Sequence, residues 1–397
     1  MPWPGVSGWE RRRFSGTGAP CPLPGVEPGS TAQPPVPNAL RYLGILGLSA
    51  ILSFAVVWGW VATLPMAFMD VEYASWRAKE VMLERCDLGD AIILGDSRAA
   101  ADIIPKRLPL RVTNLAVGGG EAIEALAALD RALTCPAPPK LVIISLDPGH
   151  FSYPDLFWQR SVRFGFMTAA EIGDLRAASE QTGDASVYAS HRLDHVPLAV
   201  RDWLYKVRFP PLYFSSLAHG GLFGRWARNQ RAFAATLADR GHFYFGTDHG
   251  SSTVTADGHM ESFRPLPILD HYFNSLLERL DRHGIEARFI AMPLNEATWR
   301  QVRPAMRDGF AAYLAGYERR YRRFRIASEI MPHWPDHFFG DQFCHLNPEG
   351  AELFSDQLAQ RLQDAPPSTQ NEAQKGWLSD TGADASVKVV PISKRGS

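Results

Sequence analysis

The sequence has few cysteines and almost no net charge, and both features exclude classes of function. Its four cysteines include no C-x-x-C pair, so they lack the spacing of a zinc cluster. A formal net charge of −1 over 397 residues gives no basic surface of the kind that binds nucleic acid. The three consecutive glycines at 118–120 do not have the spacing of a phosphate-binding loop. We therefore expect no metal, no cofactor and no nucleic-acid partner.

Both ends of the chain lack the apolar periodicity of folded segments. Residues 1–41 are rich in Pro, Gly and Ser, and residues 364–397 are polar and aperiodic. We expect both segments to be disordered tails. The remaining chain is long enough for a large domain, and a hydrophobic content of 46% supports a sizeable core.

One long apolar run lies near the N-terminus. Tyr42–Leu64 has no charged residue, and as a helix it would be about 34 Å long, enough for a hydrocarbon core of about 30 Å. A cleaved signal peptide is the alternative, but its apolar region would be only about 7–15 residues. Arginines precede the run, and Asp70 and Glu72 follow it. The positive-inside rule then predicts a single-pass inner-membrane protein with a cytoplasmic N-terminus and a periplasmic domain at 66–363.

Short apolar runs alternate with helical patterns through most of this domain. The predicted strands are 91–94, 111–115, 141–146, 287–292 and 324–327, and the predicted helices are 70–85, 121–133, 268–282, 303–320 and 348–362. This alternation predicts an α/β fold with a parallel sheet and helices on both faces. An aromatic-rich insertion at about 151–263 interrupts it, with helical pieces at 168–178, 198–207 and 224–238. We expect the insertion to lie over the carboxyl edge of the sheet.

A serine lies at the end of the first predicted strand, in Gly95-Asp96-Ser97. Gly95 permits a tight turn, and the helix that follows offers unpaired N–H groups beside Ser97. Such groups stabilise an oxyanion, so the position suits a nucleophile. The alternative is a helix-capping serine, and Asp96 is interpreted as a turn or cap residue. Ligands of parallel sheets bind at this edge, where the Gly118 turn and Asp147 also fall.

A histidine that suits a general base lies near the other end of the folded region. His345 comes just before the last predicted helix, in Asp341-Gln342-Phe343-Cys344-His345. An early serine and a late histidine suit nucleophilic acyl transfer, with a carboxylate orienting the imidazole. The alternative is a buried or capping histidine. We interpret Cys344 as structural, and His242, His249 and His259 as surface residues.

The two blocks together resemble the first and last blocks of the SGNH (GDSL-like) hydrolase superfamily. The membrane segment and the turn at 114–119 resemble its membrane-anchored, extracytoplasmic branch, which is linked to acylation of exopolysaccharides and cell-wall polymers. The resemblance implies a flavodoxin-like three-layer α/β/α fold. It implies Ser97 as nucleophile, His345 as base, and the backbone N–H groups of Ser97 and Gly118 or Gly119 as oxyanion donors.

The chain departs from the family pattern at two places. The last block usually reads Asp-x-x-His, but position 342 is Gln, and Asp341 is one residue further from His345. Either a one-residue bulge brings Asp341 to His345, or serine and histidine act as a dyad. The family often has an Asn after the third strand, where this chain has Asp147. An ionised Asp147 would repel an oxyanion unless it points elsewhere.

These features lead to two functional hypotheses. The first is a serine O-acyl (acetyl) transferase or esterase acting on a secreted polysaccharide or cell-wall polymer. Its tether at 42–64 lies in the lipid bilayer, and the resemblance implies a membrane-embedded partner that supplies the acyl group. The second is a catalytically inactive accessory protein of polysaccharide synthesis or export, which the two departures favour.

Two cysteines occupy equivalent places before neighbouring strands. Cys86 and Cys135 each lie about five residues before a predicted strand, and the first and third strands are neighbours in a flavodoxin-like sheet. We expect these residues to meet at the amino edge of the sheet. In an oxidising compartment the pair predicts a disulfide.

Overall fold

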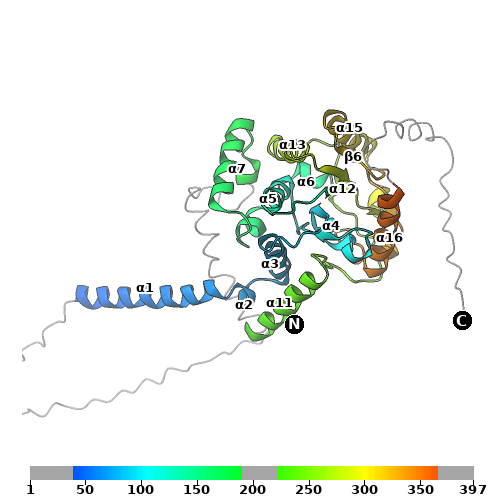
Figure 1. Ribbon diagram of the computed structural model, residues 1–397. Coiled ribbons are helices and arrows are strands. Elements are labelled where there is room, and N and C mark those ends of the chain that lie inside the picture. The colour runs from blue at the N-terminus through cyan, green and yellow to red at the C-terminus, as the bar shows by residue number, and fades with distance from the viewer. Residues whose placement is uncertain (1–38, 155, 190–221, 365–397) are drawn as a thin grey trace, which may run out of the picture. The chain divides into compact units, whose positions relative to one another are not determined.

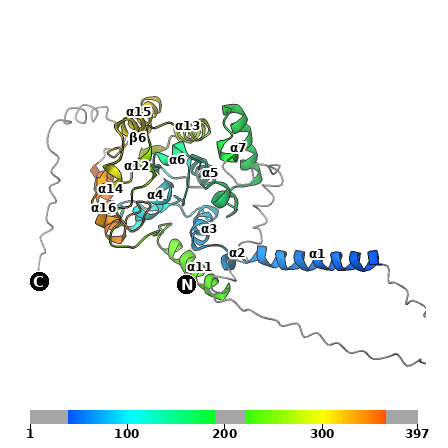
Figure 2. The same cartoon turned by 180° about the vertical axis from the view of Figure 1, so that it is seen from behind.

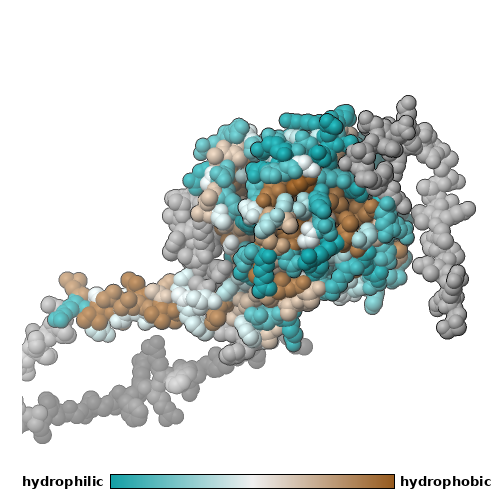
Figure 3. Space-filling view, in the orientation of Figure 1, coloured by the Kyte–Doolittle hydropathy of each residue, from teal (hydrophilic) through white to brown (hydrophobic). Residues whose placement is uncertain are grey.

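The computed structural model describes residues 39–154, 156–189 and 222–364. The chain divides into two compact units after Val57, inside the first helix. Helix α1, Ala39–Thr63, is hydrophobic along most of its length (Figure 3), and most of its side chains are exposed. Its segment Ala39–Val61 is long and apolar enough to cross a membrane, with a mean hydropathy of 1.9. A signal sequence near an N-terminus meets the same criterion.

A parallel sheet of five strands is the centre of the second unit. The strands are β1 (Ala91–Gly95), β2 (Val112–Asn114), β3 (Leu141–Ser145), β4 (Glu286–Phe289) and β6 (Phe324–Ile326). Their order is β2-β1-β3-β4-β6, and every pairing is parallel. The predicted α/β class with a parallel sheet is confirmed. β4 ends at Phe289, three residues earlier than predicted, and Ile290 still donates its N–H to the Ile144 carbonyl of β3 at 2.9 Å.

Alternate residues of each strand face opposite sides of the sheet and bury two hydrophobic cores. Ile92 and Leu94 belong to one core, and Ala91 and Ile93 belong to the other. The first core is covered by α3 (Val71–Glu84), α5 (Ala122–Leu133), α7 (Ala169–Thr182), α13 (Pro267–Arg282) and α15 (Pro304–Arg320). The second is covered by α4 (Ser97–Asp102) and α16 (Pro348–Asp364). Figures 1 and 2 show these helices around the sheet from both sides.

One further long helix, α11, and a set of short elements complete the described part of the chain. They are α2 (Pro65–Phe68), η1 (Pro105–Arg107), α6 (Gly149–Ser152), η2 (Trp158–Val162), α8 (Ser186–Ala189), α11 (Leu222–Ala238), α12 (Ala256–His259), β5 (Leu294–Asn295), α14 (Glu296–Trp299), β7 (His333–Trp334) and η3 (Asp336–Phe338). Helix α11 packs against α2 and α3. The predicted helix at 198–207 lies outside the described residues.

The last part of the insertion, residues 239–263, crosses the carboxyl edge of the sheet; we call it the strap. Near its start the backbone N–H of Asn114 donates to the carbonyl of Arg240, and Phe243 N–H donates to Ala100 at 3.1 Å. A Cβ on Gly241 would lie 1.9 Å from the Asn114 carbonyl oxygen, so only glycine permits this approach. The strap therefore borders the edge at which Ser97 lies.

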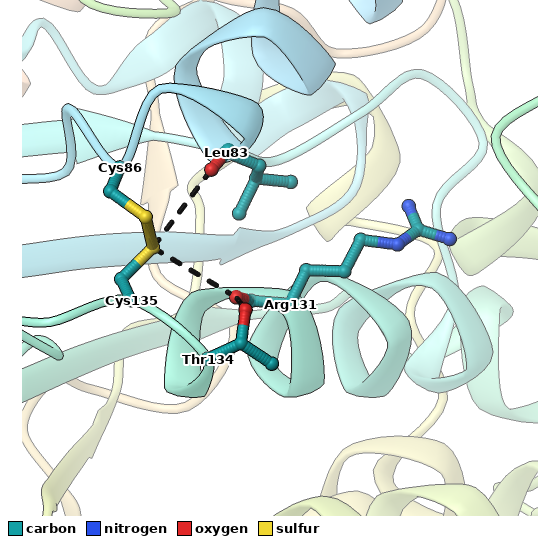
Figure 4. The surroundings of a disulfide bond; sticks show 5 residues. All are labelled: Leu83, Cys86, Arg131, Thr134 and Cys135. Carbon is teal, nitrogen blue, oxygen red and sulfur yellow. Dashed lines mark hydrogen bonds between the residues drawn. A yellow bond between two sulfur atoms is a disulfide. The ribbon is translucent and has the colours of Figure 1, made fainter.

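Cys86 and Cys135 form a disulfide, with their Cα atoms 5.5 Å apart. Cys86 follows the end of α3, and Cys135 follows the end of α5 (Figure 4). The bond joins two helices that pack on the same face of the sheet. Cys344 is a buried free thiol.

Candidate functional site

Ser97 is the first residue of α4, and Asp96 alone separates it from the end of β1. Asp96 caps the helix, because its Oδ1 accepts the N–H groups of Arg98 at 2.9 Å and Ala99 at 3.3 Å. The cap role predicted for Asp96 is therefore confirmed. A Cβ on Gly95 would lie 1.9 Å from the Ser145 carbonyl oxygen, so glycine is needed at this turn. Ser97 is partly exposed, and within the described residues neither its hydroxyl nor its N–H makes a hydrogen bond.

The glycine turn lies next to the end of β1. Val117 N–H donates to the Gly95 carbonyl at 3.0 Å, and Gly120 N–H donates to the Val117 carbonyl at 3.0 Å. Gly119 has a φ of +64°, a left-handed conformation that favours glycine. The N–H groups of Gly118 and Gly119 make no hydrogen bond within the described ranges. Backbone donors therefore remain available at the same sheet edge as Ser97.

Asp341 reaches His345 although four positions separate them in sequence. Its Oδ2 lies 2.5 Å from His345 Nδ1, and its Oδ1 accepts the N–H groups of Phe343 at 2.8 Å and His345 at 3.2 Å. Cys344 has a φ of +61°, which turns the chain and lets the longer spacing close. The structure thus places Asp341 as the carboxylate partner of His345 through a local bulge.

The electrostatics of this pair favour an ionised carboxylate. Burial raises the pKa of Asp341. The interaction with His345 and the hydrogen bonds from two backbone N–H groups lower it by more, so the pKa of Asp341 falls below its ordinary value. The ring of Phe245 in the strap stacks on His345 with centroids 4.7 Å apart. A Cβ on Gly118 would lie 3.2 Å from Phe245, so this phenyl ring connects the glycine turn with the imidazole.

His345 Nε2 is buried and has no hydrogen-bond partner among the described residues. The next residue, Leu346, donates its N–H to Asp102 Oδ1 at 2.9 Å and so fixes the His345 loop to the last residue of α4. Ser97 is thus the first residue of α4, and the loop that carries His345 is held to the last residue of the same helix. The Ser97 and His345 side chains do not lie within hydrogen-bond distance of each other. In free enzymes such catalytic hydrogen bonds are often long and shorten when substrate binds.

Asp147 follows β3 and faces two cationic groups. Its Oδ2 lies 3.5 Å from Arg98 Nη2, and its Oδ1 lies 2.9 Å from His150 Nδ1. Burial raises the pKa of Asp147, but His150 and Arg98 lower it more strongly, so it falls below its ordinary value. The negative charge of Asp147 is therefore balanced by Arg98 and His150. Its carboxylate cannot donate the hydrogen bond that an Asn side chain at this position would offer to an oxyanion.

Sequence reasoning missed several residues around the site. Arg98 and His150 lie within the motifs that were recognised, but nothing in the sequence indicated that they pair with Asp147. Phe245 and Asp257 reach the site from the strap, through contacts between residues about 100 or more positions apart, for which the sequence carries no local signal.

Two other predictions concern single residues near the site. His242 was expected at the surface, and this was wrong: the residue is 6% exposed, and its Nε2 lies 2.7 Å from the Ala101 carbonyl. That backbone partner stabilises a buried histidine, which periodicity cannot reveal. Cys344 is fully buried, with its sulfur 3.8 Å from Thr298 Oγ1. A packing role accounts for this position.

Three side chains present ligand atoms close enough for a metal ion. Those of Asp96, Asp147 and His150 lie within 4.8 Å of one another. Asp96 already accepts three backbone N–H groups, and Arg98 supplies positive charge beside Asp147. The two carboxylates are thus engaged with other groups, although neither ring nitrogen of His150 has a hydrogen-bond partner among the described residues. We assign no metal to this set.

No family model matches the chain, and no curated protein is significantly similar to it.

Proposed function

We propose that the protein is a membrane-anchored serine O-acyltransferase, most simply an acetyltransferase, or an esterase. The observation that carries this proposal is the Asp341–His345 pair, with a 2.5 Å contact on one imidazole nitrogen and a second nitrogen that has no partner in the described part of the chain. Ser97 lies at the same sheet edge, and its hydroxyl makes no hydrogen bond to the residues that the structure describes. The strand order β2-β1-β3-β4-β6 is the 2-1-3-4-5 order of flavodoxin-like sheets, which also supports the resemblance to SGNH hydrolases.

In each half-reaction His345 first accepts a proton and then donates it, and Ser97 carries the acyl group between the two half-reactions. Ser97 Oγ attacks the acyl carbonyl carbon while His345 Nε2 accepts the hydroxyl proton, and Asp341 stabilises the imidazolium. The N–H groups of Ser97 and of Gly118 or Gly119 stabilise the oxyanion. The donor's leaving oxygen takes the proton from His345, which leaves an acyl ester on Ser97. A sugar hydroxyl, or water in an esterase, then gives its proton to His345 and attacks that ester, and His345 returns the proton to Ser97 Oγ as the bond between the acyl carbon and Ser97 breaks.

The acceptor class and the location rest on the resemblance and on α1. A helix that can span a bilayer, followed by a disulfide-bonded domain, suits a protein tethered outside the cytoplasm. We propose that the acceptor is a secreted polysaccharide or cell-wall polymer, and that a membrane-embedded partner supplies the acyl group.

The full chain in lipid nanodiscs tests the catalytic part of the proposal. We expect hydrolysis of p-nitrophenyl acetate and labelling of Ser97 by a fluorophosphonate probe. Ser97→Ala and His345→Ala should reduce both by at least about 10³-fold. His283→Ala, an exposed histidine at the end of α13, is the matched control and should leave both unchanged. Labelling that survives in Ser97→Ala would contradict the assignment, whereas acetate found on an added oligosaccharide would identify a transferase.

A second candidate is a catalytically inactive accessory protein of polymer synthesis or export. The ion-paired Asp147 favours it, because the side-chain amide that the family often uses in oxyanion stabilisation is missing. The same experiment separates the two, since an inactive protein would show no Ser97-dependent labelling.

A further inference from the structure

Arg98, next to the candidate nucleophile, is a buried cation held by two carboxylates. Its side chain is 7% exposed, and its Nη2 lies 2.5 Å from Asp257 Oδ2 and 3.5 Å from Asp147 Oδ2. Asp257 lies in α12 of the strap, and Asp147 follows β3. Because a buried ion pair loses its hydration, removal of one partner leaves a costly unpaired charge. Arg98 therefore ties the helix that carries Ser97 to two other segments.

His150, whose side chain is 13% exposed, is a second cation in the same group. Its Nδ1 lies 2.9 Å from Asp147 Oδ1 and 3.5 Å from Asp96 Oδ2. Burial lowers the pKa of His150, but Asp147, Asp96 and Glu121 raise it more strongly, to about 10. Glu124 of α5 and Asp257 of the strap also interact with its charge. At neutral pH the ring is therefore an imidazolium ion.

Asp96 connects these charges to the position of Ser97. Its Oδ1 caps the first turn of α4, and its Oδ2 accepts the Asp147 N–H at 2.8 Å. Burial raises the pKa of Asp96, and His150 and Arg98 oppose that rise. Loss of either cation would favour protonation of Asp96, and a neutral carboxyl is a weaker acceptor for the helix N–H groups. The turn that presents Ser97 would then loosen.

We propose that Arg98 and His150 are positioning residues for Ser97, acting through Asp96, Asp147 and Asp257, and that the strap fixes the nucleophile through Asp257. This assignment rests on the proposed function and extends it to a role for the insertion. The two cations join α4, the loop after β3 and the strap at one point. Phe245, in the same strap, covers His345, so one segment contacts both halves of the site.

The test measures the rate of fluorophosphonate labelling of the full chain in nanodiscs, together with amide hydrogen exchange at Arg98, Ala99 and Asp147. Asp257→Asn and His150→Gln should slow labelling about 10–100-fold at saturating probe, with the half-saturating concentration changed less than about threefold, because they misplace the nucleophile. Exchange at the three amides should become at least tenfold faster. Arg98→Lys keeps the charge but loses the planar fork, so it should give an intermediate rate.

The dependence of the labelling rate on pH distinguishes a positioning role of His150 from a purely structural one. In the wild type, labelling should fall as the pH rises through about 10, where His150 loses its proton. His150→Gln should lack this step.

Arg107→Gln is the matched control, because Arg107 also pairs with two carboxylates, Glu352 and Asp356, but at the surface. It should leave labelling and exchange within twofold of the wild type.

Two results would overturn the proposal or separate it from the proposed function. Folded Asp257→Asn and His150→Gln proteins with wild-type labelling rates and wild-type exchange at the three amides would show that the network does not position Ser97. Labelling that persists in Ser97→Ala would instead remove the proposed function. In that case amide exchange still decides whether the two cations fix the first turn of α4.

Discussion

The geometry of the candidate base depends on one residue in an uncommon backbone conformation. Cys344 adopts a left-handed φ of +61°, which costs a non-glycine residue free energy. That turn allows Asp341 to contact both the N–H and Nδ1 of His345 across a spacing one residue longer than the family pattern. From the sequence, both a bulge that brings Asp341 to His345 and a dyad without Asp341 were possible. The spacing of residues could not decide between them, because it does not determine the backbone dihedral angles.

Asp341→Asn tests whether this carboxylate orients the base. An amide at this position cannot stabilise the imidazolium and favours the wrong tautomer, so labelling of Ser97 should slow about 10³–10⁴-fold. The pKa of Asp341 is lower in the folded protein than in the unfolded chain, where it is about 4. Its contribution to the free energy of unfolding is therefore fully present above a pH of about 4 and is lost as the pH falls through the folded pKa. Asp356→Asn, an exposed carboxylate on α16, is the control. A rate within threefold of the wild type in Asp341→Asn would favour the dyad.

Gly118→Ala tests the glycine turn as a source of oxyanion donors. The added Cβ would lie 1.7 Å from Glu72 Oε1, so either the Glu72 carboxylate, which pairs with Arg160, or the turn has to shift. We expect acyl transfer to slow about 10²-fold, as for loss of one oxyanion donor. Gly173→Ala in α7 is the matched control, since nothing lies within 4 Å of its added Cβ. Steady-state kinetics with p-nitrophenyl acetate measure the effect, and an unchanged kcat in Gly118→Ala would contradict a close fit of the turn around the oxyanion.

At the scale of elements, the disulfide joins the ends of α3 and α5 across 49 residues of sequence. Closure of a loop of this length restricts the unfolded chain, so Cys86→Ser/Cys135→Ser should lower the free energy of unfolding by about 2–4 kcal/mol. Urea unfolding followed by circular dichroism measures the change. A reducing agent should destabilise the wild type and leave the double variant unaffected. Equal stability of the two proteins would show that the bond contributes little, and Cys21→Ser serves as the thiol control.

The elements of the sheet were more predictable than the segment that completes the site. The β1 and β3 strands are continuous apolar runs buried on both faces, and such runs are visible in sequence. The strap has only one short helix, and it is held by distant partners: Asn295 Nδ2 donates to the carbonyls of Ser251 and Thr253 at 2.9 Å. The Arg98–Asp257 pair spans 159 positions. Contacts of this kind depend on the finished sheet, so no local pattern predicts them.

At the scale of the whole molecule, the function depends on whether α1 anchors the chain. A span of Ala39–Val61 and a cleaved signal sequence make opposite predictions for the N-terminal segment. With an anchor, the native Cys21 stays in the cytoplasm, whereas a residue on α16 faces the periplasm. With cleavage, Cys21 is lost from the mature chain and the protein is released by osmotic shock.

A membrane-impermeant maleimide distinguishes these outcomes in spheroplasts of a Gram-negative host. The wild type should be labelled only after lysis, at Cys21, because Cys344 is buried and the other two cysteines are bonded. Arg361→Cys, at an exposed position of α16, should be labelled before lysis, and Cys21→Ser should remove the signal that appears after lysis. The chain should also resist alkaline carbonate extraction, as transmembrane proteins do. Labelling of Cys21 in intact spheroplasts would reverse the topology, place Ser97 in the cytoplasm and exclude a secreted polymer as its acceptor.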